Sequence, residues 1–176
     1  MDPIEIDDRG GEKKDMEKKL RRSQVSLVTL GSGVILFGVW SVIKSLLYFR
    51  TGLFDDLDTQ VEPEQLLFVK LVTVAFVALI VFADLGFRLK IGLRARAEGM
   101  GCRQKSGYLV LAALIVLFNL AVELLSISFV VKNGLSGQSY IEYAVSMLVD
   151  LSSTVLLIEL VVTVLRVRKL RALSEG

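Results

Sequence analysis

Residues 66–87 read LLFVKLVTVAFVALIVFADLGF, and this stretch decides the class of the fold. A helix rises about 1.5 Å per residue, so about 20 apolar residues cross a hydrocarbon layer about 30 Å thick. The stretch is therefore long enough to span a membrane as one helix. It also carries Lys70 and Asp84 inside its apolar run. Charge inside a bilayer is costly, so each of these side chains is expected to have a partner, access to water or a function.

Three further stretches have the same character, and the four together organise the chain. The predicted spans are residues 23–49, 66–87, 107–131 and 140–165. The chain has 176 residues, of which 53% are hydrophobic, and its mean hydropathy is +0.58. This composition is too apolar for an ordinary soluble domain. We expect an all-α, polytopic membrane protein with four transmembrane helices in an antiparallel bundle.

The basic residues predict how this bundle is oriented. Of the 21 Lys and Arg residues, all except Lys44, Arg50, Lys70 and Lys132 lie before the first span, between the second and third spans, or after the fourth. The positive-inside rule then places both termini in the cytoplasm. The connections at residues 50–65 and 132–139 would face outward. The expected location is a plasma (inner) membrane.

The chain divides into a charged cytoplasmic segment (1–22), the transmembrane domain (23–166) and a basic cytoplasmic tail (167–176). Two interpretations of residues 12–22 are open. They form either a short polar helix that continues into the first span or a partly disordered tail that only enforces topology, and we prefer the tail. Basic residues on this side would lie near anionic lipid headgroups, which we expect as partners along with the bilayer.

Several classes of function are excluded or disfavoured by composition. Histidine is absent and Cys102 is the single cysteine, so the chain cannot form a disulfide within itself. Zinc and redox-metal sites built from Cys and His are excluded, as are Cys–His and Ser–His nucleophiles. No catalytic spacing is recognisable among the Asp, Glu, Lys and Ser residues. We expect no enzyme activity, no metal, no cofactor and no nucleic-acid partner.

The sequence predicts an intramembrane polar network at the centre of the bundle. At 100° per residue, the polar side chains of each helix fall on one face. The first two spans contribute cations and the last two contribute anions, at similar depths in the outer half of the bilayer, so we expect them to pair. The network comprises Lys44, Lys70, Thr73, Asn119, Glu123 and Asp150. Pairing that only fixes the helix register, snorkelling of Lys44, and a transport or ligand role are all open.

Two ion pairs are predicted nearer the cytoplasmic side. Asp84 precedes Arg88 by four residues, which is the favourable order for a pair within one helix. Glu159 lies about 180° around the fourth helix from Asp150. Glu159 therefore either reaches toward Arg166 at the inner interface or meets another subunit, and we prefer the subunit contact.

Small residues form a separate face on the first helix. Gly31, Gly38, Ser41 and Ser45 share this face, and small residues let membrane helices approach closely. The sequence thus favours a non-enzymatic bundle that assembles as a homo-oligomer or as a small subunit of a membrane complex. The alternative is a small channel or transporter that conducts ions, protons or a small charged solute along the polar network. A voltage sensor is excluded because the fourth helix carries its basic residues at the cytoplasmic end.

Overall fold

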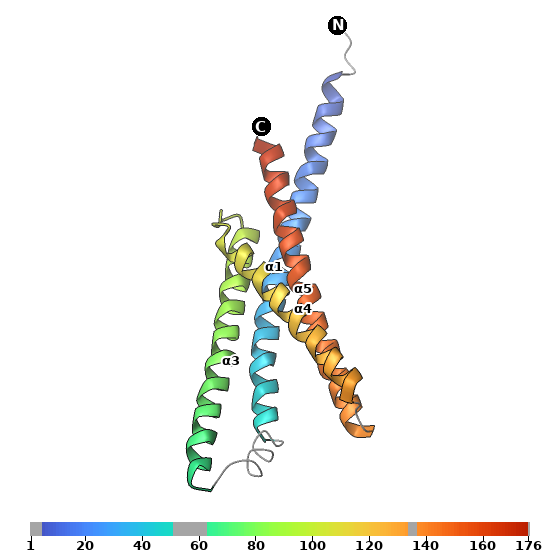
Figure 1. Cartoon of the computed structure of the whole chain (residues 1–176). Helices are drawn as coiled ribbons and strands as arrows, with labels where there is room; N and C mark the ends of the chain where they lie inside the picture. The colour runs from blue at the N-terminus through green and yellow to red at the C-terminus, as the bar shows by residue number, and fades with distance from the viewer. Residues whose placement is uncertain (1–4, 51–62, 134–136, 176) are drawn as a thin grey trace. The chain divides into compact units, whose positions relative to one another are not determined.

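The computed structural model describes residues 5–50, 63–133 and 137–175, and these residues form four long helices (Figure 1). The helices are α1 (Glu5–Arg50), α3 (Pro63–Gly99), α4 (Gly107–Asn133) and α5 (Gly137–Glu175). The described ranges contain no strand, so the all-α prediction is confirmed for them. Residues 51–62 of the predicted acidic outer loop and residues 134–136 of the second predicted outer connection lie outside the described residues.

All four helices are long and apolar enough to cross a membrane. The candidate spans are Lys14–Leu46, Leu66–Gly99, Gly107–Lys132 and Tyr143–Ser174. They overlap the four stretches predicted from composition, and they identify the chain as an integral, multi-pass membrane protein. The helices α3 and α5 also continue well beyond the apolar runs at 66–87 and 140–165.

The N-terminal segment differs from the preferred interpretation. α1 begins at Glu5 and runs without a break into the first span, so the partly disordered tail is wrong for residues 5–22. Residues 12–22 consist mainly of Glu, Lys, Arg, Leu and Met, which are strong helix formers. Leu20 also packs against the buried core, so tertiary contact supports the extension. The polar-helix alternative therefore holds.

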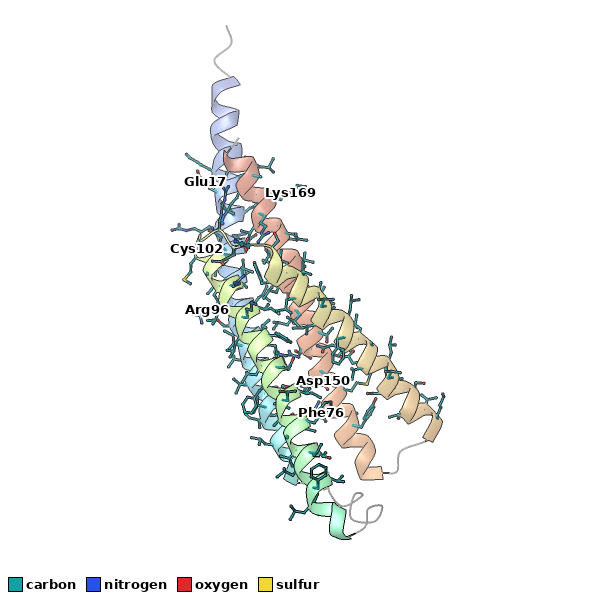
Figure 2. All side chains as sticks on the ribbon, turned by 60° about the vertical axis from the view of Figure 1, so that its left-hand side comes forward. Glu17, Phe76, Arg96, Cys102, Asp150 and Lys169 are labelled. Carbon is teal, nitrogen blue, oxygen red and sulfur yellow. The ribbon has the colours of Figure 1, made fainter. Side chains whose placement is uncertain are left out.

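The chain divides into two compact units. Unit 1 comprises Met1–Val34 and Ile91–Gly176, and unit 2 comprises Ile35–Lys90. Unit 1 thus holds segments of all four helices, whereas unit 2 holds a segment of α1 and most of α3. In unit 1, Glu17, Cys102 and Lys169 lie toward the same end, with Asp150 further along α5 (Figure 2).

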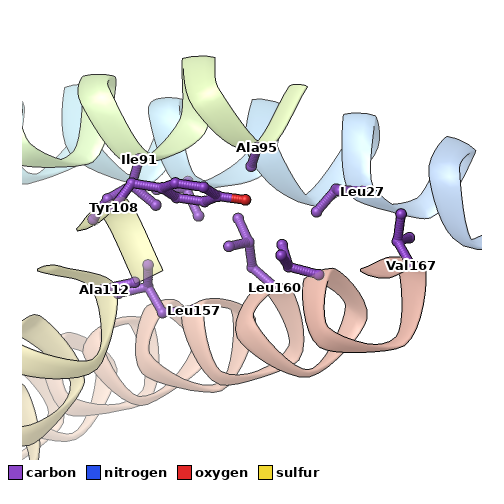
Figure 3. Close-up of a cluster of buried hydrophobic side chains, with 10 residues drawn as sticks. Leu27, Ile91, Ala95, Tyr108, Ala112, Leu157, Leu160 and Val167 are labelled. Carbon is purple, nitrogen blue, oxygen red and sulfur yellow. The ribbon is translucent and has the colours of Figure 1, made fainter. Parts of the chain in front are cut away.

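A single apolar cluster forms the core of unit 1 (Figure 3). Its members come from all four helices: Leu27, Val34, Ile91, Ala95, Tyr108, Ala112, Leu157, Leu160, Val164 and Val167. Lipid tails are as apolar as these side chains, so packing in a membrane depends on close fit rather than on escape from water. The core therefore needs the small residues that bring the helix backbones together.

Contacts of two glycines show how α1 and α3 run relative to each other within unit 1. A Cβ atom on Gly31 would lie 2.7 Å from the Gly92 carbonyl oxygen, and one on Gly99 would lie 2.8 Å from the Gln24 carbonyl oxygen. Position numbers thus rise along α1 as they fall along α3, so these segments run antiparallel. α4 and α5 are also antiparallel neighbours, because Ser106 bonds to Arg168 and Asn119 bonds to Thr154.

Candidate functional site

Thr154 is the centre of the polar contacts between α4 and α5. Its side chain is almost fully buried, at 2% exposure. The Thr154 hydroxyl lies 3.0 Å from the Asp150 carbonyl oxygen of its own helix and 3.4 Å from a Glu123 carboxylate oxygen. Asn119 donates to the same hydroxyl from α4, at 3.4 Å. A hydroxyl carries only one proton, so Thr154 serves either Glu123 or the Asp150 carbonyl at a given moment.

The structure thus brings three of the predicted network residues to one helix contact. Asn119 and Glu123 lie one turn apart on α4, and both face Thr154 on α5. Asp150 lies one turn before Thr154, and its side chain is half-buried. The Asn119 and Glu123 side chains thus tie α4 to α5 through the Thr154 hydroxyl.

The predicted basic members of the network belong to unit 2. Lys44 lies on α1, and Lys70 and Thr73 lie on α3, all with half-buried side chains. Lys44, Lys70 and Asp150 each take part in an ionic, hydrogen-bonding or ring contact, so none of them is without a partner. Pairing of Lys44 and Lys70 with Glu123 and Asp150 would join the two units, and it stays a prediction.

Asp84 and Arg88 form an ion pair in unit 2. The Arg88 Nε donates to both carboxylate oxygens of Asp84, at 3.0 and 2.9 Å. Arg88 is buried at 7% exposure, and its aliphatic stem lies against α1 at Gly38. A Cβ atom on Gly38 would lie 3.2 Å from the Arg88 Cβ, so this glycine leaves room for the arginine stem. The pair therefore holds the arginine in a dry contact between α1 and α3.

Ser45, on the small-residue face of α1, satisfies its own polar group. The Ser45 hydroxyl donates to the Ser41 carbonyl oxygen at 2.9 Å. A serine hydroxyl bonded within its own helix exposes no unpaired polar group to a neighbouring helix or to lipid. Gly31 is buried, and its position against Gly92 and Arg96 leaves no space for a side chain.

Glu159 and Arg166 are the predicted pair that the structure leaves apart. Both side chains are exposed on α5, and the described part of the chain holds no hydrogen bond or ion pair for either of them. They are two helical turns apart, a rise of about 10 Å along α5. The exposed side chains around Glu159 are apolar: Val155, Ile158 and Val162. Glu159 is therefore a carboxylate on an apolar face of a candidate span.

A second polar site was missed by sequence reasoning. We call it the Glu98 cluster, and it comprises Glu98, Gln104, Ser106, Tyr108, Arg168 and Arg171. The Glu98 carboxylate is 2% exposed, and it accepts hydrogen bonds from Arg168 Nε at 2.6 Å and from the Tyr108 hydroxyl at 2.5 Å. Arg168 Nη2 donates to the same carboxylate at 3.0 Å. Fork-shaped pairing of this kind is the strongest ionic contact that an arginine makes.

The remaining donors of the Glu98 cluster bind the connection between α3 and α4. Arg168 Nη1 donates to the Ser106 hydroxyl at 2.7 Å, and Nη2 donates to the Gln104 carbonyl oxygen at 3.0 Å. Arg171 Nη2 donates to the Glu98 carbonyl oxygen at 2.8 Å, near the C-terminus of α3. The cluster thus joins the end of α3, the start of α4 and the C-terminal part of α5. All of these contacts lie within unit 1.

One sequence signal could have found the Glu98 cluster. Glu98 is the lone acid between Asp84 and Glu123, in a segment rich in Lys and Arg. This signal marks Glu98 as unusual, but it does not identify Arg168 as its partner. Arg168 is 70 positions away in the chain, so the periodicity of a single helix cannot relate it to Glu98.

The Glu98 cluster and the Thr154 contacts both connect helices. Among the residues that the structure describes, no group of three or more His, Cys, Asp or Glu side chains could hold a metal ion. The fold and these contacts define the class of the chain, an all-helical multi-pass membrane protein. Comparison with protein-family models, curated proteins and solved structures finds no match to the chain.

Proposed function

We propose that the chain is a non-enzymatic membrane helix bundle that assembles with other membrane subunits, as a homo-oligomer or as a small subunit of a larger complex. In this proposal the four helices run antiparallel to their neighbours and both termini are cytoplasmic, in a plasma (inner) membrane. Two observations support the orientation. Basic residues crowd the connections predicted to be cytoplasmic, and Glu17, Cys102 and Lys169 lie toward one end of unit 1 (Figure 2).

The exposed Glu159 carboxylate, which has no partner among the described residues, is the observation that carries the assembly proposal. Six other charged residues inside the spans have partners, namely Lys44, Lys70, Asp84, Arg88, Glu123 and Asp150. Glu159 has none among the described residues, and it lies exposed between apolar side chains. A central acidic residue in a membrane helix costs about 2.5–3.5 kcal/mol on insertion scales. A contact with another subunit would offset that cost by giving the carboxylate a partner.

Native mass spectrometry of the protein released from its own membrane in nanodiscs tests this proposal. We expect a mass above that of the 19.5 kDa chain, either a multiple of it or a complex with a second protein. Exclusive recovery as a monomer, with no partner in a cross-linked sample of the same membrane, would overturn the proposal. Ser152→Ala is a suitable control variant, because that exposed hydroxyl bonds only to its own helix at Leu148.

The alternative function is conduction of ions, protons or a small charged solute along the network. The observation that favours it is the placement of Asn119, Glu123 and Thr154 at one half-buried contact, with Asp150 a turn away. Flux into liposomes that contain the purified protein tests this function. We expect Glu123→Gln and Asp150→Asn to abolish any flux that follows this path. A flux that both variants leave unchanged would exclude these side chains from the path.

A further inference from the structure

The seam between α1 and α3 in unit 1 carries two arginines whose charges are not compensated. Arg96 is half-buried on α3, and its stem lies against α1, because a Cβ atom on Gly31 would lie 2.9 Å from the Arg96 Cγ. Figure 2 shows Arg96 on the side of α3 that is turned away from α4 and α5. Arg21 is exposed on α1. Neither guanidinium has a hydrogen bond or an ion pair among the residues that the structure describes.

The two arginines flank one contact between the helices. Gly99 of α3 faces the Gln24 carbonyl oxygen of α1. Arg96 precedes Gly99 by three residues, and Arg21 precedes Gln24 by three. Because these segments are antiparallel, the two arginines lie on opposite sides of the contact, about 10 Å apart along the helix axes. Arginine stems are long and lie along apolar surface with the charged group free, so both guanidinium groups can reach one ligand.

The acids near this seam do not neutralise it. The Glu98 carboxylate is buried, and the fork of Arg168 occupies it. On α1, Glu17 and Lys18 lie about one turn before Arg21, and their charges offset each other. The seam therefore keeps a net positive charge, which suits an anionic ligand.

The position of the seam favours a lipid over a soluble anion. Arg96 lies inside the candidate span Leu66–Gly99, and Arg21 lies inside the candidate span Lys14–Leu46. Residues three before and four after Arg96 share its face of α3, and both are apolar and exposed. A ligand that fits this surface has a negative headgroup and an apolar tail. The exposed apolar side chains beside the arginines are Val25 (65% exposed), Leu93 (56%) and Met100 (68%).

We propose that Arg21 and Arg96 bind the headgroup phosphate of a net-anionic phospholipid, whose acyl chains lie along the exposed apolar side chains of the α1–α3 seam. A planar guanidinium matches the geometry of a phosphate. The positive charge of the seam repels the ammonium group of a zwitterionic headgroup. The proposed orientation places the seam in the cytoplasmic leaflet, which is the leaflet with anionic lipids. This inference goes beyond the proposed assembly and does not depend on it.

Native mass spectrometry of the full-length protein in a mild detergent tests this site. The protein is titrated with dioleoyl phosphatidylglycerol, which is net anionic, and separately with dioleoyl phosphatidylcholine, which is zwitterionic and has the same acyl chains. A basic residue near a membrane surface strengthens binding to anionic lipid about fivefold. We therefore expect the tightest site to prefer phosphatidylglycerol about 25-fold, through its two arginines.

Charge-removing variants make the result specific to the seam. Arg96→Gln and Arg21→Gln should each weaken phosphatidylglycerol binding about fivefold, and the double variant should bind the two lipids equally. Glutamine keeps the Cγ that lies against Gly31, so the variants are expected to fold, which unchanged unfolding in lipid-free detergent verifies. Arg166→Gln is the matched control, because it removes the same charge from an exposed position of α5, and it should keep the original affinity.

Equal binding of the two lipids, or a phosphatidylglycerol preference that survives the double variant, would overturn the inference. So would a loss of affinity in Arg166→Gln that equals the loss in Arg96→Gln, because total charge and not the seam would then attract the lipid. Displacement of the lipid by an equal concentration of inorganic phosphate would assign the site to a soluble anion. Displacement by a polyglutamate peptide would assign it to an acidic protein segment. The proposed assembly is tested separately, by the mass of the complex from the native membrane.

Discussion

At the scale of single residues, the buried carboxylate of Glu98 is the most demanding feature of the chain. A buried charge is stable only where its partners surround it, and removal of one partner leaves the other uncompensated. Glu98 meets this condition through Arg168 and Tyr108, while Arg171 binds its backbone carbonyl. One acid thereby holds together three segments that the sequence separates widely.

We predict that Arg168→Ala destabilises the protein by about 3 kcal/mol. This is the lower end of the cost of breaking a buried ion pair, because Arg168 itself is partly exposed. Unfolding in mixed micelles with increasing SDS measures the change in free energy. Arg166→Ala is the matched control, since Arg166 is an exposed arginine of the same helix without contacts, and we expect a change within about 0.5 kcal/mol. Equal effects of the two variants would contradict a structural role for the Glu98 cluster.

At the scale of helices, glycines decide how closely α1 and α3 approach in unit 1. The Gly31 position faces a backbone carbonyl oxygen at Gly92, and Gly99 faces the backbone at Gln24. Backbone atoms cannot turn away as a flexible side chain can, so an added methyl group forces the helices apart. Membrane helices gain stability mainly from such close packing, and a small shift therefore loses contacts along both helices.

Gly31→Ala is expected to lower the free energy of unfolding by about 1–3 kcal/mol, because it overpacks this contact. Gly86→Ala is the control, since an added Cβ there meets nothing within 4 Å. It should leave stability unchanged or raise it by less than about 1 kcal/mol, through the better helix propensity of alanine. The same SDS titration compares both variants. A destabilisation by Gly86→Ala that matches the effect of Gly31→Ala would contradict close approach of the helices as the cause of the loss.

At the scale of the whole molecule, the main question is on which side of the membrane each connection between helices lies. The basic connection between α3 and α4 contains Cys102, which is exposed and is the single cysteine of the chain. The proposed orientation places this residue in the cytoplasm. Chemical labelling of Cys102 therefore reports on which side of the membrane this connection lies.

A membrane-impermeant maleimide is expected to leave Cys102 unmodified in intact cells and to modify it after permeabilisation. The reason is that the positive-inside rule retains the basic connection on the cytoplasmic side. The double variant Cys102→Ser with Thr59→Cys should behave in the opposite way, because residue 59 lies in the connection proposed to face outward. Modification of Cys102 in intact cells would exclude a cytoplasmic location for this connection.

The limits of sequence reasoning follow from what each feature depends on. The pair of Asp84 and Arg88 was predictable because both residues lie on one helix turn, where geometry is independent of the rest of the fold. Glu159 and Arg166 lie two turns apart on α5, and no contact between them is found among the described residues, so this pair stays a prediction. The contact of Asn119 and Glu123 with Thr154 required knowing which side of α5 faces α4, and periodicity along one helix does not contain that information.

The sequence by itself determined that four helices are long and apolar enough to cross a bilayer, and where the charges lie along them. These properties depend on residues close together in the chain, so composition and helical geometry suffice. Only the tertiary structure decided that Glu98 binds Arg168, that Gly31 lies against Gly92, and that Glu159 stays exposed. Such contacts depend on which helix faces meet, and several rotations of an apolar helix satisfy the same hydrophobic pattern.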